Sequence, residues 1–346
     1  MPRARWRLLF IARSLMIAFF CLSTGVYAAG PLLIAYGGHN ETVGPLWVGI
    51  EKGLFTKHGV DPRMLQVRSG PIIMATLASG GAPVVWPSPS SALSAAAGGL
   101  KIGCFAAGSN KTPRELMVRR GIESVEDLRG KIFGVQSIGG GFWLQTMVIV
   151  EGLGLDPDKY QLKMRVIGDT GTVTQALISA NVDAAVLPYS FADIAKKAGA
   201  RSLADSAKMK LAYQGPSFCA QRDFIAHSPD IPIGLTKGLI EALVFIQDPA
   251  HKREVMEILK KNLRLSKEEE VEGSYKVLRL QMPTLDVAPH VEAWQAIRRI
   301  VARVNAKVQE ADLEQILVGS VVRNVEESGF LSDMKRDWDA NSKKGR

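Results

Sequence analysis

Short β-prone runs alternate with helical segments from residue 31 onward, and no other feature of the sequence constrains the fold as strongly. The first series of β-prone runs spans residues 32–36, 63–67, 84–86 and 102–106. Helical patterns occupy the intervals, at 45–57, 72–78 and 90–97. Strands that alternate with helices in this way form a mostly parallel sheet with helices on both faces. We therefore predict an α/β fold.

The alternation restarts after an extended segment near residue 118, which predicts a second α/β unit. Its β-prone runs are 132–136, 162–167 and 184–187, and its helical patterns are 142–151, 173–180 and 191–198. A further run at 218–226 reads as a strand, and the chain beyond it is helical almost to its end. Residues 331–346 are polar and basic, and we expect them to form a flexible tail.

The first 28 residues have the three-part pattern of a secretory signal peptide. Four arginines precede an apolar run at 15–26, and small residues flank the end of the run at Val26-Tyr27-Ala28. The run is too short to span a bilayer comfortably. We therefore expect residues 1–28 to be removed on export to the periplasm, with an uncleaved N-terminal anchor as the alternative.

The formal net charge of +9 becomes +5 once the signal and its four arginines are gone, since no acid lies in that segment. A mildly basic protein favours anionic ligands or an anionic membrane surface, although a general bias of composition is an equal explanation. The basic residues do not cluster with interleaved aromatic residues, so we expect no nucleic-acid partner.

Two cysteines, Cys104 and Cys219, remain in the mature chain. In an oxidising compartment they are able to pair. We favour the other interpretation, in which each is a small buried hydrophobic residue.

Several motifs, in order along the chain, resemble those of periplasmic solute-binding proteins of ABC importers. Segment 44–55 reads GPLWVGIEKGLF and resembles the family's opening P-x-[WY]-x-A-x-E-x-G-[FL]-F. Segment 75–80 (ATLASG) is similar to its A-L-A-S-G, and 121–135 to its G-I-x-S-x-x-D-L-x-G-K-x-[IV]-G-V block. Segments 154–158, 182–186 and 327–330 are also similar to family segments. The resemblance is to the group that takes nitrate, sulfonates, taurine and thiamine-pyrimidine precursors.

The resemblance implies a type II periplasmic-binding-protein fold, with two α/β lobes joined by two crossover strands near residues 118 and 214. Lobe 1 would comprise residues 30–118 plus 215–330, and lobe 2 residues 119–214. A small ligand, anionic or polar, would bind in the cleft between the lobes, and an ABC permease with its ATPase would be the membrane partners. The resemblance also implies a monomer that needs no cofactor or metal. Segments 81–86 and 137–141 depart from the family pattern, so the ligand of any one relative does not transfer.

Loops between strands and helices carry the candidate ligand-binding residues. Ligands of open α/β sheets bind at the carboxyl ends of strands, where helix N-termini offer free N–H groups and a partial positive charge. The candidates in these loops are His39, Asn40, Trp86, Ser88, Ser90, Ser91, Ser137, Gly139, Gly140, Gly141, Thr170 and Tyr189. For the histidine and asparagine the alternative is a surface turn, and for the serines it is helix capping alone. We expect Asp169 to act as a cap.

We expect no catalysis. The five histidines are scattered, and neither cysteine has a partner nearby in the sequence. No zinc-protease, phosphate-loop or paired-cysteine metal motif is present. Two alternatives stay open, an enzyme built on the same fold and a sensory binding protein without a transporter. The ligand class also stays open among sulfonate, nitrate, carboxylate, aromatic acid and pyrimidine.

Overall fold

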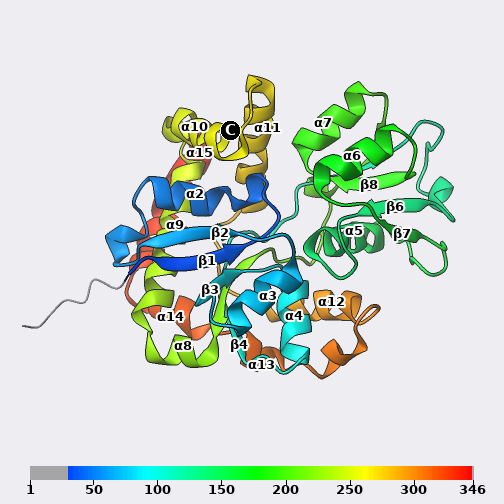
Figure 1. Ribbon diagram of the computed structural model, residues 1–346. Coiled ribbons are helices and arrows are strands. Elements are labelled where there is room, and N and C mark those ends of the chain that lie inside the picture. Colours follow the sequence, from blue (N-terminus) through cyan, green and yellow to red (C-terminus); the bar gives the residue numbers. More distant parts are fainter. Residues whose placement is uncertain (1–29, 345–346) are drawn as a thin grey trace, which may run out of the picture. The chain divides into compact units, whose positions relative to one another are not determined.

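The computed structural model describes residues 30–344, so the predicted signal peptide at 1–28 lies outside the described residues. From Pro31 onward the chain forms one compact unit. It contains two five-stranded mixed sheets with helices around them (Figure 1). The α/β prediction is therefore confirmed.

The first sheet has the order β2-β1-β3-β10-β4. Its strands are β1 (Leu32–Tyr36), β2 (Pro62–Gln66), β3 (Val84–Trp86), β4 (Ile102–Ala107) and β10 (Ser217–Gln221). β1 pairs with β2 and β3 in parallel, whereas β10 runs antiparallel to β3 and β4. The helices that follow its parallel strands are α2 (Gly44–Glu51), α3 (Gly70–Ala78) and α4 (Pro89–Ala97).

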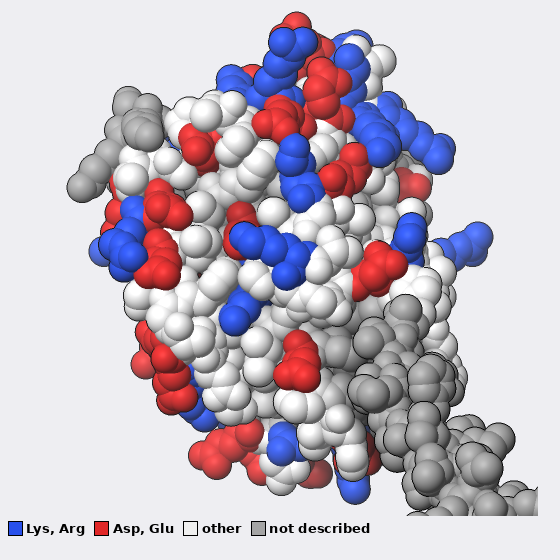
Figure 2. Space-filling model, turned by 90° about the vertical axis from the view of Figure 1, so that its left-hand side faces the viewer, with Lys and Arg blue, Asp and Glu red and all other residues white. Residues whose placement is uncertain are grey.

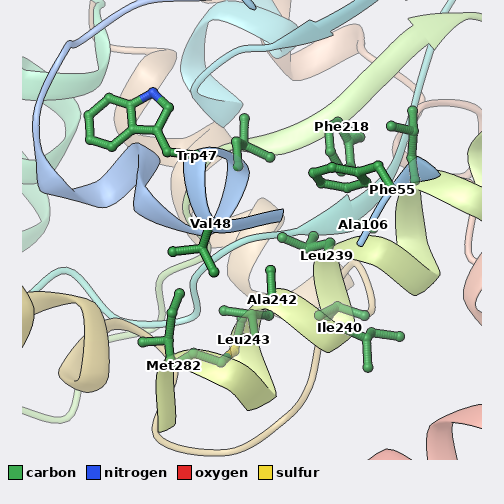
Figure 3. Packing of buried hydrophobic residues seen from close by; sticks show 14 of the residues in the cluster. Trp47, Val48, Phe55, Ala106, Phe218, Leu239, Ile240, Ala242, Leu243 and Met282 are labelled. Carbon is green, nitrogen blue, oxygen red and sulfur yellow. The ribbon is translucent and has the colours of Figure 1, made fainter. Parts of the chain in front are cut away.

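The two faces of the first sheet form different parts of the core because successive side chains of a strand point in opposite directions. Ile34 and Tyr36 join the cluster that contains α2 and α9 (Asp230–Gln247), whereas Ala35 joins the cluster under α3 and α4. Figure 3 shows the first cluster, in which Leu239 and Leu243 of α9 face α2. Each such buried aliphatic side chain contributes about 1.5–3 kcal/mol to folding.

The second sheet has the order β7-β6-β8-β5-β9. Its strands are β5 (Glu115–Val118), β6 (Ile132–Val135), β7 (Lys163–Val166), β8 (Ala184–Leu187) and β9 (Arg201–Asp205). The helices around it are α5 (Gly141–Gly152), α6 (Thr170–Ile178) and α7 (Tyr189–Lys197). β5 is antiparallel to β8 and β9, so residues 115–118 belong to this sheet, although the predicted limits placed them in lobe 1. The other predicted limits of the lobes stay predictions.

Two neighbouring segments connect the sheets. Residues 108–114 lead from β4 to β5, and residues 206–216 lead from β9 back to β10. The two segments are joined by backbone hydrogen bonds: Gly108 N–H donates to the Pro216 carbonyl at 3.0 Å, and Gly215 N–H donates to the Ser109 carbonyl at 2.9 Å. The expected pair of crossovers is thus present, and the first one precedes the predicted position by several residues.

The remaining helices follow β10 and surround the first sheet. They are α8 (Arg222–His227), α9, α10 (Lys252–Leu263), α11 (Glu268–Gln281), α12 (Val291–Val301), α13 (Leu313–Ile316), α14 (Ser320–Glu327) and α15 (Phe330–Lys344). Short 3₁₀ turns complete the chain at η1 (Glu41–Val43), η2 (Thr56–His58), η3 (Glu126–Leu128), η4 (Ser206–Lys208), η5 (Pro249–His251) and η6 (Ala306–Glu310). Over residues 30–344, no helix combines the length and apolar character needed to cross a membrane.

The predicted flexible tail is wrong, because residues 330–344 form helix α15. Leu331 and Trp338 are buried, and Met334 packs against the same cluster. These positions lie on one face of a helix at spacings of three and four residues. α15 therefore packs on α9, although most of its residues are charged or polar.

Charged side chains of both signs are mixed on the face in Figure 2, where Lys and Arg lie among Asp and Glu. Ion pairs between neighbouring helices include Lys252–Glu272 and Lys261–Glu51. The excess of positive charge is therefore not gathered into one patch on that face.

Cys104 and Cys219 form a disulfide, so the interpretation as two separate buried thiols is wrong. The two residues are register partners on the adjacent strands β4 and β10. The bond closes a loop across 115 positions of sequence and fixes the returning strand to the first sheet.

We expect the Cys104→Ala/Cys219→Ala variant to lose roughly 2–4 kcal/mol of unfolding free energy, because a disulfide restricts the unfolded chain. Urea denaturation of the oxidised protein, with and without dithiothreitol, measures the loss. Dithiothreitol should leave the double variant unchanged. Equal midpoints for the oxidised protein and the double variant would contradict a structural disulfide.

Candidate functional site

A cavity of about 570 Å³ lies where loops of the two sheets meet. Residues from the loops after β1, β2 and β3 line it on the side of the first sheet, and residues from the loops after β6 and β7 on the side of the second. The crossovers contribute Arg114 and Pro216. This is the strand-end position at which α/β folds bind ligands.

Four α-helices begin at this cavity. Their N-cap residues are Ser69 for α3, Ser88 for α4, Gly140 for α5 and Asp169 for α6, and all four line the cavity. The first amides of a helix lack partners within the helix and carry a partial positive charge, so four helix starts favour a negatively charged ligand.

The four helix starts differ in how their amides are satisfied. Ser88 Oγ accepts a hydrogen bond from Ser91 N–H, and Asp169 Oδ1 accepts one from Thr172 N–H at 2.8 Å. The bonds from Thr172 lower the pKa of Asp169, so its carboxyl is ionised and satisfied as a cap. Among the described residues, no side chain caps α3 or α5, but the first turn of α3 contains Pro71, which has no N–H. The start of α5 is therefore the strongest anion site among the four.

Glycines let the start of α5 come close to its neighbours. A Cβ on Gly141 would lie 3.1 Å from Cβ of Ser88, which belongs to the first sheet's side of the cavity. A Cβ on Gly140 would lie 2.4 Å from Ser137 Oγ. Gly139 has φ +74°, a conformation that favours glycine. The 139–141 run thus permits both the turn and the close approach.

Arg114 places a buried cation beside α5. Its side chain is only 4 % exposed, and its guanidinium carbon lies 5.8 Å from the centre of the Phe142 ring. Its backbone N–H donates to Ser206 Oγ at 2.8 Å, which fixes the residue in the crossover. Nη1 of the guanidinium is buried and has no hydrogen-bond partner among residues 30–344.

The guanidinium of Arg114 remains charged in this buried position. Burial lowers its pKa, while the nearby Glu41 and Tyr213 raise it. An arginine begins with so high a pKa that it keeps its proton in proteins. Arg114 therefore offers the cavity that it lines a positive charge, and its enclosed Nη1 is a hydrogen-bond donor still without a partner.

Apolar and polar groups share the rest of the wall. Trp86 packs its ring against Phe218, and its Nε1 has no hydrogen-bond partner within the residues that the structure describes. Ile73 and Phe142 add apolar surface. Gln136 donates to Thr170 Oγ1 at 3.3 Å. The cavity can thus accept a ligand that has both a charged head and an apolar body.

Seven of the predicted ligand-binding residues line this cavity. They are Asn40, Trp86, Ser88, Ser137, Gly140, Gly141 and Thr170. That they bind a ligand stays a prediction.

The other five predicted residues do not line the cavity. The ring nitrogens of His39 lie 2.9 Å from Tyr36 Oη and 2.9 Å from the Asn262 carbonyl oxygen. Gly139 provides the turn, and Tyr189 donates its hydroxyl to Asp205 at 2.6 Å.

Ser90 and Ser91 are buried behind Ser88. Their hydroxyls lie 2.9 and 3.0 Å from Ser88 Oγ. They therefore support the start of α4 from within the protein.

Several lining residues were not among the predicted ones, above all Arg114. Others with polar or aromatic side chains include Thr42, Arg68, Ser69, Gln136, Phe142 and Gln145. A basic residue directly before a strand that is buried throughout was the available signal for Arg114, since an isolated charge is seldom buried without a role.

Comparison with known proteins places the chain in a family. The model of the family described as NMT1/THI5 like matches residues 40–243. A protein of Brucella abortus (strain 2308), named as a binding protein, is 27% identical over 267 residues, which cover 75% of this chain and 79% of that protein.

Solved structures with a similar fold include three binding proteins. The periplasmic aliphatic sulphonate binding protein SsuA of Escherichia coli has a TM-score of 0.66 at 17% identity, over 83% of this chain and 91% of its own. The periplasmic nitrate-binding protein NrtA of Synechocystis PCC 6803 has a TM-score of 0.65 at 12% identity, over 88% of this chain and 90% of its own. A ligand-binding component of an ABC-type import system from Staphylococcus aureus has a TM-score of 0.68 at 12% identity, over 84% of this chain and 97% of its own.

These likenesses confirm the expected fold of two α/β lobes. The family model covers more than half of the sequence. The chain belongs to the NMT1/THI5-like family.

Proposed function

We propose that this protein is an extracytoplasmic solute-binding protein that captures a small organic anion in the cavity between its two sheets. The observation that carries the proposal is the placement of Arg114, a buried cation with an unused donor, beside the uncapped start of α5. A buried charge is costly unless it is paired and hydrogen-bonded. An anionic headgroup would supply both the charge and the acceptors.

The size and walls of the cavity favour an organic ligand. Its volume of about 570 Å³ lies within the range of small-molecule sites and far exceeds what an inorganic ion of a few atoms needs. Trp86, Phe142 and Ile73 offer apolar surface for a flat or aliphatic body. Two structural neighbours are named for anionic ligands, an aliphatic sulphonate and nitrate, which is in keeping with this class.

Closure of the two sheets on the ligand would couple binding to delivery. Over residues 30–344 the two crossover segments are the only chain connections between the sheets, so they are the natural hinge. A ligand held by groups of both sides favours the closed state over the open one. We propose that a permease and its ATPase recognise the closed form, in line with the neighbour named as a component of an ABC-type import system.

We propose binding without catalysis. Both cysteines of the described chain are joined in the disulfide, so neither offers a free thiol as a nucleophile. The charged groups at the cavity are the guanidinium ions of Arg68 and Arg114 and the capping carboxylate of Asp169, a set suited to holding an anion.

A thermal-shift screen of benzenesulfonate, benzoate, taurine and nitrate tests the function. We expect stabilisation of about 2.7 kcal/mol by the preferred organic anion at ~100 times its dissociation constant. Arg114→Met should weaken that affinity on the order of 100-fold, because a buried charge-assisted hydrogen bond contributes about 1.5–3 kcal/mol.

Two further variants accompany Arg114→Met. Arg114→Lys retains the charge and should keep part of the affinity, while Arg68→Met at the exposed rim should lose less than about tenfold, since exposed charges contribute less. Full affinity in a folded Arg114→Met protein would refute the proposed site.

A second prediction concerns the start of α5. Ser137→Ala removes the Oγ that a Cβ on residue 140 would meet, so the Ser137→Ala/Gly140→Val protein should fold normally. The new side chain should fill the anion position and abolish the ligand-induced shift, whereas Ser137→Ala alone should retain most of it. An unchanged shift in the double variant would show that the anion binds elsewhere.

A further inference from the structure

A second buried ionisable group lies close to Arg114. Glu41, in the 3₁₀ turn η1, is only 1 % exposed, and its Oε1 has no hydrogen-bond partner in the described part of the chain. Its sequence neighbours Asn40 and Thr42 both line the cavity, whereas Glu41 does not. The carboxyl group is therefore buried directly behind a wall of the site.

Arg114 is the charged group that acts on Glu41. Burial raises the pKa of Glu41, and the charge of Arg114 lowers it. Glu41 acts in return on Arg114, although no hydrogen bond or ion pair within 4 Å joins them in the part of the chain that the structure describes. The two side chains thus interact through their charges without a direct bond, and Nη1 of Arg114 keeps a donor without a partner among the described residues.

The other charged groups near η1 are engaged elsewhere. The elements that pack on η1 are α2 and α11. On α2, Glu51 pairs with Lys261. On α11, three glutamates form ion pairs with lysines: Glu269 with Lys197, Glu270 with Lys267 and Glu272 with Lys252. The other ionisable side chains of α11 also have partners: Lys276 lies over the Tyr189 ring, Tyr275 donates to the Ile246 carbonyl, and Arg279 donates to Gln247. Glu268 lies at the opposite end of the helix. Facing Arg114 from the second crossover is Tyr213, which is un-ionised because burial raises its pKa.

We propose that an anion which binds Arg114 is taken up together with one proton, and that Glu41, buried behind the wall of the cavity, accepts this proton. This inference rests on the proposed function and deepens it. In the ligand-free protein the guanidinium stabilises the Glu41 carboxylate. An anion on the guanidinium offsets that stabilisation and adds repulsion at low dielectric, so the carboxylate binds a proton from solvent and becomes neutral.

The consequence is an affinity that depends on pH in a defined direction. The pKa of Glu41 must be higher in the complex than in the ligand-free protein. Affinity is then constant at low pH, falls by up to tenfold per pH unit between the two pKa values, and levels off above them. Because burial raises the pKa of Glu41 above the usual 4.5, this fall lies at a pH above 4.5.

Isothermal titration calorimetry with benzenesulfonate tests the proposal directly. Titrations at each pH from about 5 to 9, in two buffers of different ionisation heat, give the number of protons taken up. Benzenesulfonate stays ionised over this range, so the protons belong to the protein. We expect uptake approaching one proton within the window for wild type, and none for Glu41→Gln, whose affinity should be flat with pH.

The matched control is Glu51→Gln on the neighbouring helix α2, where the carboxylate is exposed and paired with Lys261. On binding benzenesulfonate, the Glu51→Gln protein should take up as many protons as the wild-type protein does. Equal proton uptake by wild type and Glu41→Gln, or none by either across the range, would overturn the proposal.

A second measurement needs no ligand. The pKa of Glu41 is raised on folding, so the folded state binds more protons there, and stability relative to Glu41→Gln should fall as pH rises above 4.5. Without the charge of Arg114 this fall should extend to higher pH, as urea unfolding of Arg114→Met and Arg114→Met/Glu41→Gln would reveal. An unchanged window would overturn the coupling between the two charges. Absence of benzenesulfonate binding by wild type would instead count against the proposed function, because the ligand-free profiles decide the coupling independently.

Discussion

The guanidinium of Arg114, buried beside the start of α5, is the feature on which the account of this protein depends. Several backbone hydrogen bonds hold that group in place. The first crossover, which carries it, is bound to the second crossover through Gly108 and Gly215, and the amides of Asn110 and Lys111 both donate to the Gln281 carbonyl at the end of α11. Ser206 then fixes the backbone of Arg114 itself. The cation is thus held by the same two segments that connect the sheets, so a ligand bound to Arg114 would lie beside both connections.

Such an arrangement sacrifices stability for binding. Two buried ionisable groups, Arg114 and Glu41, lack a direct bond to each other, and an incompletely paired buried charge costs several kcal/mol. The apolar clusters on both faces of the first sheet, the cluster under α5 in the second, and the disulfide between β4 and β10 offset that cost. A ligand that completes the pairing should therefore bind and stabilise at once, which joins the energetics of the fold to its function.

Local sequence patterns were sufficient for most of the sheets and for the helix starts, because both are set by residues close together in the chain. The predicted strand at 32–36 is β1. Ser88, Gly140 and Asp169 precede helices that begin at the cavity, and all three line it. Features that depend on packing between distant segments were not predictable. The disulfide requires the register of β4 against β10, and α15 has few apolar positions among its charges. Arg114 was not among the predicted site residues, because its burial results from the packing of the two sheets and not from its sequence neighbours.

A crystal structure of the protein with benzenesulfonate bound would test the central claim most directly. The account predicts sulfonate oxygens within hydrogen-bond distance of Arg114 Nη1 and of the first amides of α5, with the ring against Phe142 or Trp86. A sulfonate bound instead in the outer crevice lined by Lys101, Arg222 and Lys307, with no anion at Arg114, would contradict it.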